Sequence, residues 1–140
     1  MATATLTLAE TGKQLIFNQA LNKVDAGTTW KFHIFTNNHT PAFADTVASY
    51  TEDATAGYAA VSMTPSSWTL SNPSGTIEKA AYPNIAETYT SSNSSTPAYG
   101  VYLTDSTSTI LIGAALFSDG PYTLGSAGGI INVAVDLQIA

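Results

Sequence analysis

Residues 128–139 read GGIINVAVDLQI, and the pattern within this stretch decides the fold. Apolar side chains occupy every second position, namely Ile131, Val133, Val135, Leu137 and Ile139. Because successive side chains of a strand point to opposite faces of its sheet, this alternation predicts a strand with one buried face. A slip of one residue in the pairing would expose the whole apolar set, so the pattern also fixes the register.

The same period of two recurs along the chain and predicts further strands. They are expected at residues 2–8, 30–35, about 58–63, about 67–71 and 99–103. Residues 42–57 are interpreted as a connection that holds a short helical turn, and residues 76–90 are ambiguous. Clusters of Gly, Pro, Asn and Ser separate these segments, as expected for turns.

One segment near the N-terminus follows a helical period instead. Phe17, Leu21 and Val24 recur at helical spacing, and Glu10 precedes them, where the helix dipole favours negative charge. This pattern predicts one helix over about residues 11–23.

Residues 110–117 differ from the other strands because they are apolar on both faces. Such a strand must be covered on both sides, either by its own fold or by a partner subunit, and the sequence leaves both alternatives open. The candidate interface residues are Leu111, Ala115, Phe117, Trp68 and Tyr102.

Together these elements predict a mainly β chain. Seven or more short strands with one early helix are typical of a β-sandwich of Greek-key or jelly-roll type. A single domain over residues 1–140 is expected, with a strand at 2–8, the helix at about 11–23, and the remaining strands between 30 and 139.

The charge balance excludes several classes of partner. The chain has four basic residues, all lysine, and a formal net charge of −6. Nucleic acids and anionic membranes bind clustered Lys and Arg, so neither is expected as a partner. The longest strongly apolar run, residues 110–117, is too short to span a bilayer, and no secretory signal is visible at the N-terminus.

A shortage of charge points instead to contact with other proteins. Only 10% of the residues are charged, against an average of roughly 25% in soluble domains. A surface so poor in charge is weakly protected against association, which favours a component of an assembly. The chain also has no cysteine, so disulfides and thiolate metal sites are excluded.

Both histidines lie in the stretch KFHIFTNNHTP at residues 31–41. His33 and His39 could bind a metal with Asp45, because imidazole and carboxylate groups suit zinc or nickel. Their spacing matches no compact ligand motif, so we interpret His33 as a strand residue and His39 as a turn residue. No metal and no cofactor are expected.

Catalytic patterns are equally weak. A Ser-His-Asp triad is possible by composition, but the chain lacks a G-x-S-x-G elbow. The adjacent acids Glu52 and Asp53 are interpreted as solvated loop residues, and Gly125–Gly129 as a hairpin turn, because it lacks the Lys-Ser/Thr of a phosphate loop. No catalytic residue is assigned, and the expectation is a protein that is not an enzyme.

Large aromatic side chains are numerous for so few charges. They are Tyr50, Tyr58, Trp68, Tyr82, Tyr89, Tyr99, Tyr102 and Tyr122. Tyr and Trp suit sugar stacking and protein interfaces alike, because each offers a large apolar face with one polar group. Ordinary packing between strands is the alternative interpretation for each of them.

The order of several short motifs resembles a known group of proteins. After the expected helix come KFHIFTNNHTP, Gly57-Tyr58-Ala59, the segment YGVYLTD at 99–105, and Leu116-Phe117 before DGPYT at 119–123. This order is similar to that in small virion proteins of tailed bacteriophages and covers most of residues 10–139.

The resemblance implies a structural protein of the virion, made in the host bacterial cytoplasm and without an active site. Its expected partners are copies of itself, as a trimer or dimer, and other virion proteins such as the major capsid protein. Decoration of the capsid exterior is the first expectation. A tail or fibre component that recognises a host surface glycan or protein, through Trp68 and the loop at residues 91–97, is the alternative.

Overall fold

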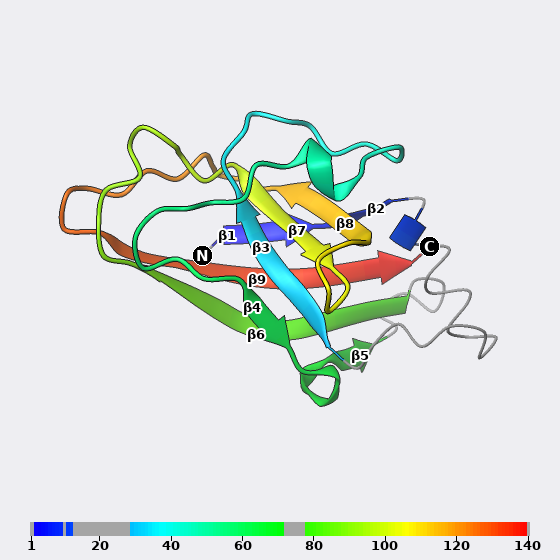
Figure 1. Cartoon of the computed structure of the whole chain (residues 1–140). Helices are drawn as coiled ribbons and strands as arrows, with labels where there is room; N and C mark the ends of the chain where they lie inside the picture. Colours follow the sequence, from blue (N-terminus) through cyan, green and yellow to red (C-terminus); the bar gives the residue numbers. More distant parts are fainter. Residues whose placement is uncertain (1, 10, 13–28, 72–77, 140) are drawn as a thin grey trace.

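The structure is a computed structural model that describes residues 2–9, 11–12, 29–71 and 78–139. Its strands are β1 (Ala2–Thr5), β2 (Thr7–Leu8), β3 (Trp30–Phe35), β4 (Val61–Met63), β5 (Thr69–Ser71), β6 (Glu78–Tyr89), β7 (Gly100–Thr104), β8 (Leu111–Leu116) and β9 (Gly129–Ile139). Two short 3-10 helices, η1 (Val47–Ser49) and η2 (Pro65–Ser67), lie among them. The chain is therefore mainly β, as predicted (Figure 1).

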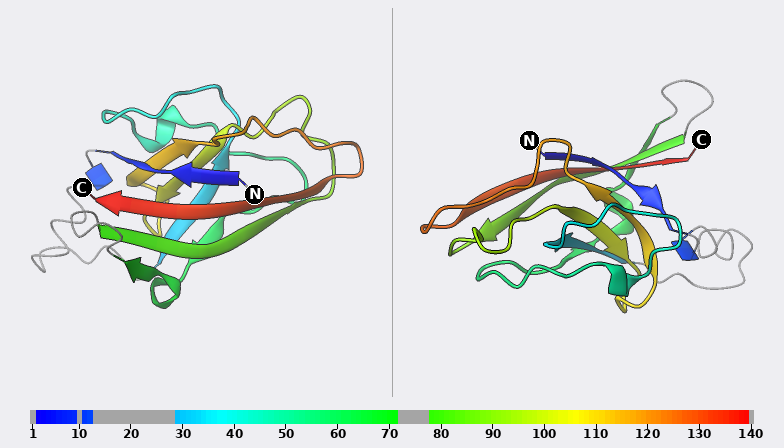
Figure 2. Two further views of the ribbon diagram at one scale, coloured as in Figure 1. Left: turned by 180° about the vertical axis from the view of Figure 1, so that it is seen from behind. Right: turned by 90° about the horizontal axis from the view of Figure 1, so that it is seen from above.

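The strands form two sheets that lie as separate layers (Figure 2). The four-stranded sheet has the order β1-β9-β6-β5, and the five-stranded sheet has the order β2-β8-β7-β3-β4. All neighbouring pairs are antiparallel except β1 and β9, which run parallel. The N-terminal and C-terminal strands thus lie side by side in one layer.

The predicted first strand is divided between the layers. Residues 2–5 pair with β9 in one sheet, and Thr7 and Leu8 pair with β8 in the other. Leu6 stands between the two pieces and is only 5% exposed, so it enters the core where the chain crosses. A strand that changes sheets closes the corner between two packed layers.

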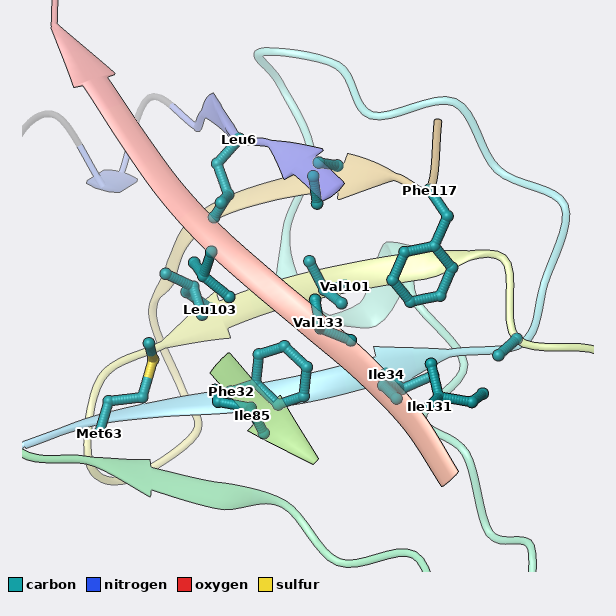
Figure 3. Close-up of a cluster of buried hydrophobic side chains, with 14 of the residues drawn as sticks. Leu6, Phe32, Ile34, Met63, Ile85, Val101, Leu103, Phe117, Ile131 and Val133 are labelled. Atoms are coloured by element: carbon teal, nitrogen blue, oxygen red, sulfur yellow. The ribbon is translucent and has the colours of Figure 1, made fainter. Parts of the chain in front are cut away.

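Apolar side chains from both sheets fill the space between the layers, as Figure 3 shows for Phe32, Leu103 and Val133. The predicted faces of β3 and β9 are confirmed, because Phe32, Ile34 and every inward β9 residue from Ile131 to Leu137 are buried. Burying each such side chain stabilises the fold by roughly 1.5–3 kcal/mol. The two sheets are held together mainly by this shared core.

Both apolar faces of strand β8 are covered within the chain. Ile112 packs into the core between the sheets. Leu111 and Ala114 pack into a second cluster on the outer face of the five-stranded sheet, with Phe35, Tyr50 and Tyr102. A partner subunit is not needed to bury this strand.

The segment that is ambiguous in sequence, residues 76–90, contains the longest strand, β6. Its pairing with β9 shifts between Tyr82 and Ile85, where Pro83 and Asn84 interrupt the ladder. A β-bulge of this kind moves later side chains to the opposite face, so a single period of two does not run through the strand. Proline also lacks the N–H that a ladder requires.

The predicted helix at residues 11–23 falls, apart from Thr11 and Gly12, outside the described residues. The helical turn expected within residues 42–57 is confirmed as η1. Within the part of the chain that the structure describes, no helix is long and apolar enough to cross a membrane.

Candidate functional site

Titratable side chains gather on the outer face of the five-stranded sheet, around His33 of β3. The ring is 2% exposed. Its Nδ1 atom lies 2.8 Å from Oε1 of Glu52, and its Nε2 atom lies 3.0 Å from Oγ1 of Thr104. Because a carboxylate only accepts hydrogen bonds, Nδ1 of His33 carries the proton of the first bond.

Glu52 is held in place by the segment that carries it, which we call the strap (residues 51–60). The N–H of Asp53 donates to the carbonyl of Ile34 over 2.9 Å, and Glu52 forms an isolated bridge with Phe35. The hydroxyl of Tyr58, from the same strap, donates to Oε1 of Glu52 over 3.1 Å. The strap therefore follows the edge of β3 and brings Glu52 to His33.

Three rings are stacked over this face of the sheet. His33 stacks on Tyr102 with 4.6 Å between ring centroids, and Tyr102 stacks on Tyr50 at 5.2 Å. Phe35 and His39 contact the ring of Tyr50 in tilted and edge-on arrangements. The rings cover one another's faces, so the stack contributes to packing and offers no open aromatic face to a ligand.

His39 and Asp45 are brought together as the sequence suggested, but without His33. Nε2 of His39 lies 2.8 Å from Oδ2 of Asp45, which also accepts from the Tyr50 hydroxyl at 2.7 Å and the Ala42 N–H at 2.8 Å. Burial acts to raise the pKa of Asp45, but these donors outweigh it and lower the pKa below 3.8. The carboxylate closes the turn after β3.

Glu52, His33 and Thr104 have the composition of an acid, a base and a hydroxyl nucleophile. Thr104 is 0% exposed, and its hydroxyl donates to the carbonyl of Asp105 over 3.0 Å. A nucleophile must meet its substrate, and this hydroxyl is enclosed by the fold. Among the described residues there is also no group of three or more His, Cys, Asp or Glu side chains suited to a metal.

A second acidic pair joins the strap to β6, with Asp53 on the strap and Glu87 on the strand. Asp53 and Glu87 are 4% and 3% exposed, and the Tyr89 hydroxyl donates to Oδ2 of Asp53 over 2.9 Å. Oε1 of Glu87 has no hydrogen-bond partner among the described residues. Burial raises the pKa of Glu87 to about 7, the N–H of Ala59 opposes the rise, and the charge of Asp53 adds to it.

An open cleft of about 400 Å³ lies beside the strap. Its lining is rich in hydroxyl groups and consists of Thr36, Thr51, Glu52, Ala54, Thr55, Ser91, Ser92, Ser95 and Thr96. Glu52 brings the one charged group of this lining, and its Oε1 is already fixed by His33 and Tyr58. The cleft can therefore offer hydrogen bonds to a ligand that carries hydroxyl groups.

The predicted interface residues divide between the two packed clusters, with Ala115, Phe117 and Trp68 at the one between the sheets, and Leu111 and Tyr102 in the one on the outer face. Leu111, Ala115, Phe117 and Tyr102 are each at most 5% exposed and are covered by the chain itself. Trp68 is half-buried and makes edge-to-face contacts with Trp30 and Tyr82, with ring centroids 6.0 and 5.1 Å away. It does not line the cleft.

The sequence alone does not show which residues contact one another on this face. Thr104 and Tyr102 lie two residues apart on β7, and the antiparallel register sets Tyr102 opposite His33. Glu52 lies in a connection with no hydrophobic period. Glu87 lies in β6, where the bulge interrupts the period of two. Glu87 does not stand out by composition either, because its strand also contains Glu78, Lys79 and Asn84.

A scan against protein-family models, a search of the curated proteins and a search of the solved structures each found no match for this chain.

Proposed function

We propose that this chain is a non-enzymatic structural protein of a bacteriophage virion, attached to the capsid exterior. In this role it stabilises the particle through contacts with the major capsid protein and with copies of itself, as a trimer or dimer. A β-sandwich of Greek-key or jelly-roll type, with a helix near its N-terminus, is the architecture that we infer for it. The resemblance of its motif order to small virion proteins supports the proposal.

The observation that carries the proposal is the outer face of the four-stranded sheet. Ile130 of β9 is 56% exposed, and Ala86, Thr88 and Asn132 are also exposed there. In the left view of Figure 2, β1, β9 and β6 present this face with no other described segment in front of them. An exposed face of mainly uncharged side chains with one large apolar residue suits contact with another protein.

The limited charge on this face predicts how attachment to the particle depends on salt. Lys79 pairs with Asp136 over 2.7 Å, so their charges are already balanced within the chain. Attachment through apolar contacts is weakly screened by salt, whereas attachment through exposed ion pairs is not. We expect the protein to stay on purified particles at high ionic strength.

The test uses purified particles and a charged substitution on the proposed contact face. Ile130→Glu is expected to abolish binding of the recombinant chain to particles that lack it. Phe43→Glu is the matched control, because Phe43 is 50% exposed on the loop after β3 and away from this sheet. Equal binding by both variants and the wild type would contradict the proposal that this face contacts the capsid.

The second candidate is a tail or fibre component that recognises a host surface glycan. The hydroxyl-rich cleft favours it, since the cleft includes four residues of the 91–97 loop and a carboxylate in a fixed position. Sugars are bound through such hydrogen bonds, usually together with an aromatic face. A glycan array with the assembled protein tests it, and an absence of bound glycans would reject it.

A further inference from the structure

The strap covers a buried acid that has no partner for one of its oxygens. Glu87 points inward from β6, with 3% of the residue exposed and Oε1 without a hydrogen bond among the described residues. A buried carboxyl group in this state is far more stable neutral than ionised, because ionisation would leave an unpaired charge out of water. Its neutrality is therefore part of the closed structure.

The groups around Glu87 make its ionisation still less favourable. Asp53 approaches from the strap with a negative charge, and both of its oxygens are occupied, by the Tyr89 hydroxyl and the Thr55 N–H. Tyr58 also faces it from the strap, and burial raises the pKa values of Tyr58 and Tyr89 beyond their ordinary value of 10.0. Both phenols therefore remain uncharged across neutral pH.

Other charges near the strap do not offset this repulsion. Glu52 faces the same tyrosine, and its Oε1 atom is shared between the Tyr58 hydroxyl and the ring of His33. The N–H of Ala59 is the donor that faces Glu87, and it comes from the strap itself. Every stabilising contact of this carboxyl group thus depends on the strap lying in place.

The strap is attached to β6 and to Thr90 by the Tyr89–Asp53 hydrogen bond, by the stacking of Tyr58 on Tyr89 and by backbone contacts. Thr90 donates to the carbonyl of Ala56 over 2.8 Å, and Gly57 approaches β6 so closely that a Cβ atom there would lie 2.7 Å from the Thr88 carbonyl oxygen. Gly57 has a φ of +96°, which a residue with a side chain rarely adopts. The strap lies outside the named strands of the two sheets, and a connecting segment of this kind can open locally while the sheets remain intact.

We propose that Glu87 acts as a proton-operated latch, which holds the strap closed while neutral and releases it when ionised. Because the strap carries Thr51, Glu52, Ala54 and Thr55, its opening also dismantles one wall of the hydroxyl-rich cleft. The latch is independent of the virion role, since it concerns the isolated chain. Ionisation of Glu87 therefore increases the fraction of chains in which this wall of the cleft is open.

The expected pH window follows from the difference between the closed and open states. Glu87 has a pKa of about 7 in the closed state, and an exposed glutamate has the ordinary value of 4.5. Opening therefore releases a proton between these values, and the open fraction grows as the pH rises and levels off above about 7. At up to tenfold per pH unit, the opening equilibrium grows about 100-fold between about pH 4.5 and about pH 7.5.

Hydrogen exchange of the full chain measures this opening directly. The amides of Asp53 and Thr90 are hydrogen-bonded across the strap and serve as reporters. After correction for the intrinsic pH dependence of exchange, their protection is expected to fall about 100-fold over the window, while amides in β7 keep theirs. Protection that stays constant with pH would overturn the proposal.

Two variants and one titration complete the test. Glu87→Gln is neutral at every pH and is expected to keep the strap protected throughout. Asp136→Asn removes a carboxylate that is 32% exposed on the outer face of the same sheet, and it should behave as the wild type. A Glu87→Gln chain with the wild-type pH dependence would contradict the latch. Carbon-13 NMR of the wild type needs no variant, and a Glu87 titration midpoint near 4.5 instead of about 7 would overturn it.

Discussion

Nδ1 of His33 lies 2.8 Å from Oε1 of Glu52, and this bond joins the centre of β3 to the strap. His33 is enclosed, whereas the Glu52 side chain is 43% exposed. We expect His33→Ala to destabilise the fold by about 2 kcal/mol, because Glu52 and Thr104 lose a shared partner and the ring leaves its stack with Tyr102. Urea unfolding monitored by circular dichroism measures the change.

His39→Ala is the matched control, since it removes the other histidine. The His39 side chain is 33% exposed and its partner Asp45 keeps two further donors, so a loss of at most about 1 kcal/mol is expected. Equal losses in the two variants would contradict a special role for the His33–Glu52 contact.

Glu87→Gln should stabilise the whole chain at neutral pH. The folded-state pKa of Glu87, about 7, lies above its ordinary value of 4.5, so stability is complete below 4.5 and is lost as the pH rises towards about 7. The difference corresponds to about 3 kcal/mol for this buried group. Unfolding free energies measured at intervals over this range should fall in the wild type and stay flat in the variant.

Asp105→Ala should be strongly destabilising. The Asp105 carboxylate accepts from the N–H groups of Thr107, Thr109 and Ile110 and from the Thr107 hydroxyl, and so fixes the turn between β7 and β8. A loss of about 3 kcal/mol is expected, because several backbone donors lose a charged partner together. Asp119→Ala, at an exposed position, should change stability by less than about 1 kcal/mol.

The Asp105 carboxylate should also make the stability of the chain depend on pH in the acidic range. Burial acts to raise the pKa of Asp105, but the N–H groups and the Thr107 hydroxyl outweigh it and lower the pKa below 3.8. Its contribution is therefore present above pH 3.8 and disappears as the pH falls further. The gap in stability between Asp105→Ala and wild type should narrow in that acidic range, and a gap that widens there would contradict the assignment.

Gly100→Ala tests the packing of β7 against β8. A Cβ atom at Gly100 would lie 2.1 Å from the carbonyl oxygen of Ala115 and 2.8 Å from Cα of Leu116, both in backbone that is held by the sheet. We expect a loss of several kcal/mol or failure to fold, by analogy with other overpacked cores that lose roughly 1–3 kcal/mol or more. At Gly125 nothing lies within 4 Å, so Gly125→Ala should be nearly neutral in the same thermal unfolding assay.

The sequence predicted the strands whose apolar residues keep a single period. Phe32 and Ile34 on β3, and Val133 and Val135 on β9, are buried on the predicted side. It left β6 ambiguous because the bulge at Pro83 changes which side chains face the core. Periodicity describes one segment at a time, so a local irregularity removes the signal.

The candidate site was harder to predict than the strands. Its contacts join His33 to Glu52 and Asp53 to Tyr89, and these pairs depend on the path of the strap and on which strands become neighbours. No local pattern encodes that path. Sequence alone also left open what covers β8, because a fold and a partner subunit bury an apolar face in the same way.

The most direct test of the proposed function is the copy number of this chain in purified particles from its source, measured by gel densitometry against the major capsid protein. We expect a copy number comparable with that of the capsid protein, retained after washing at high ionic strength. A much smaller number would favour the tail or fibre alternative over decoration of the capsid. Complete absence of the chain from the particles would contradict the virion role.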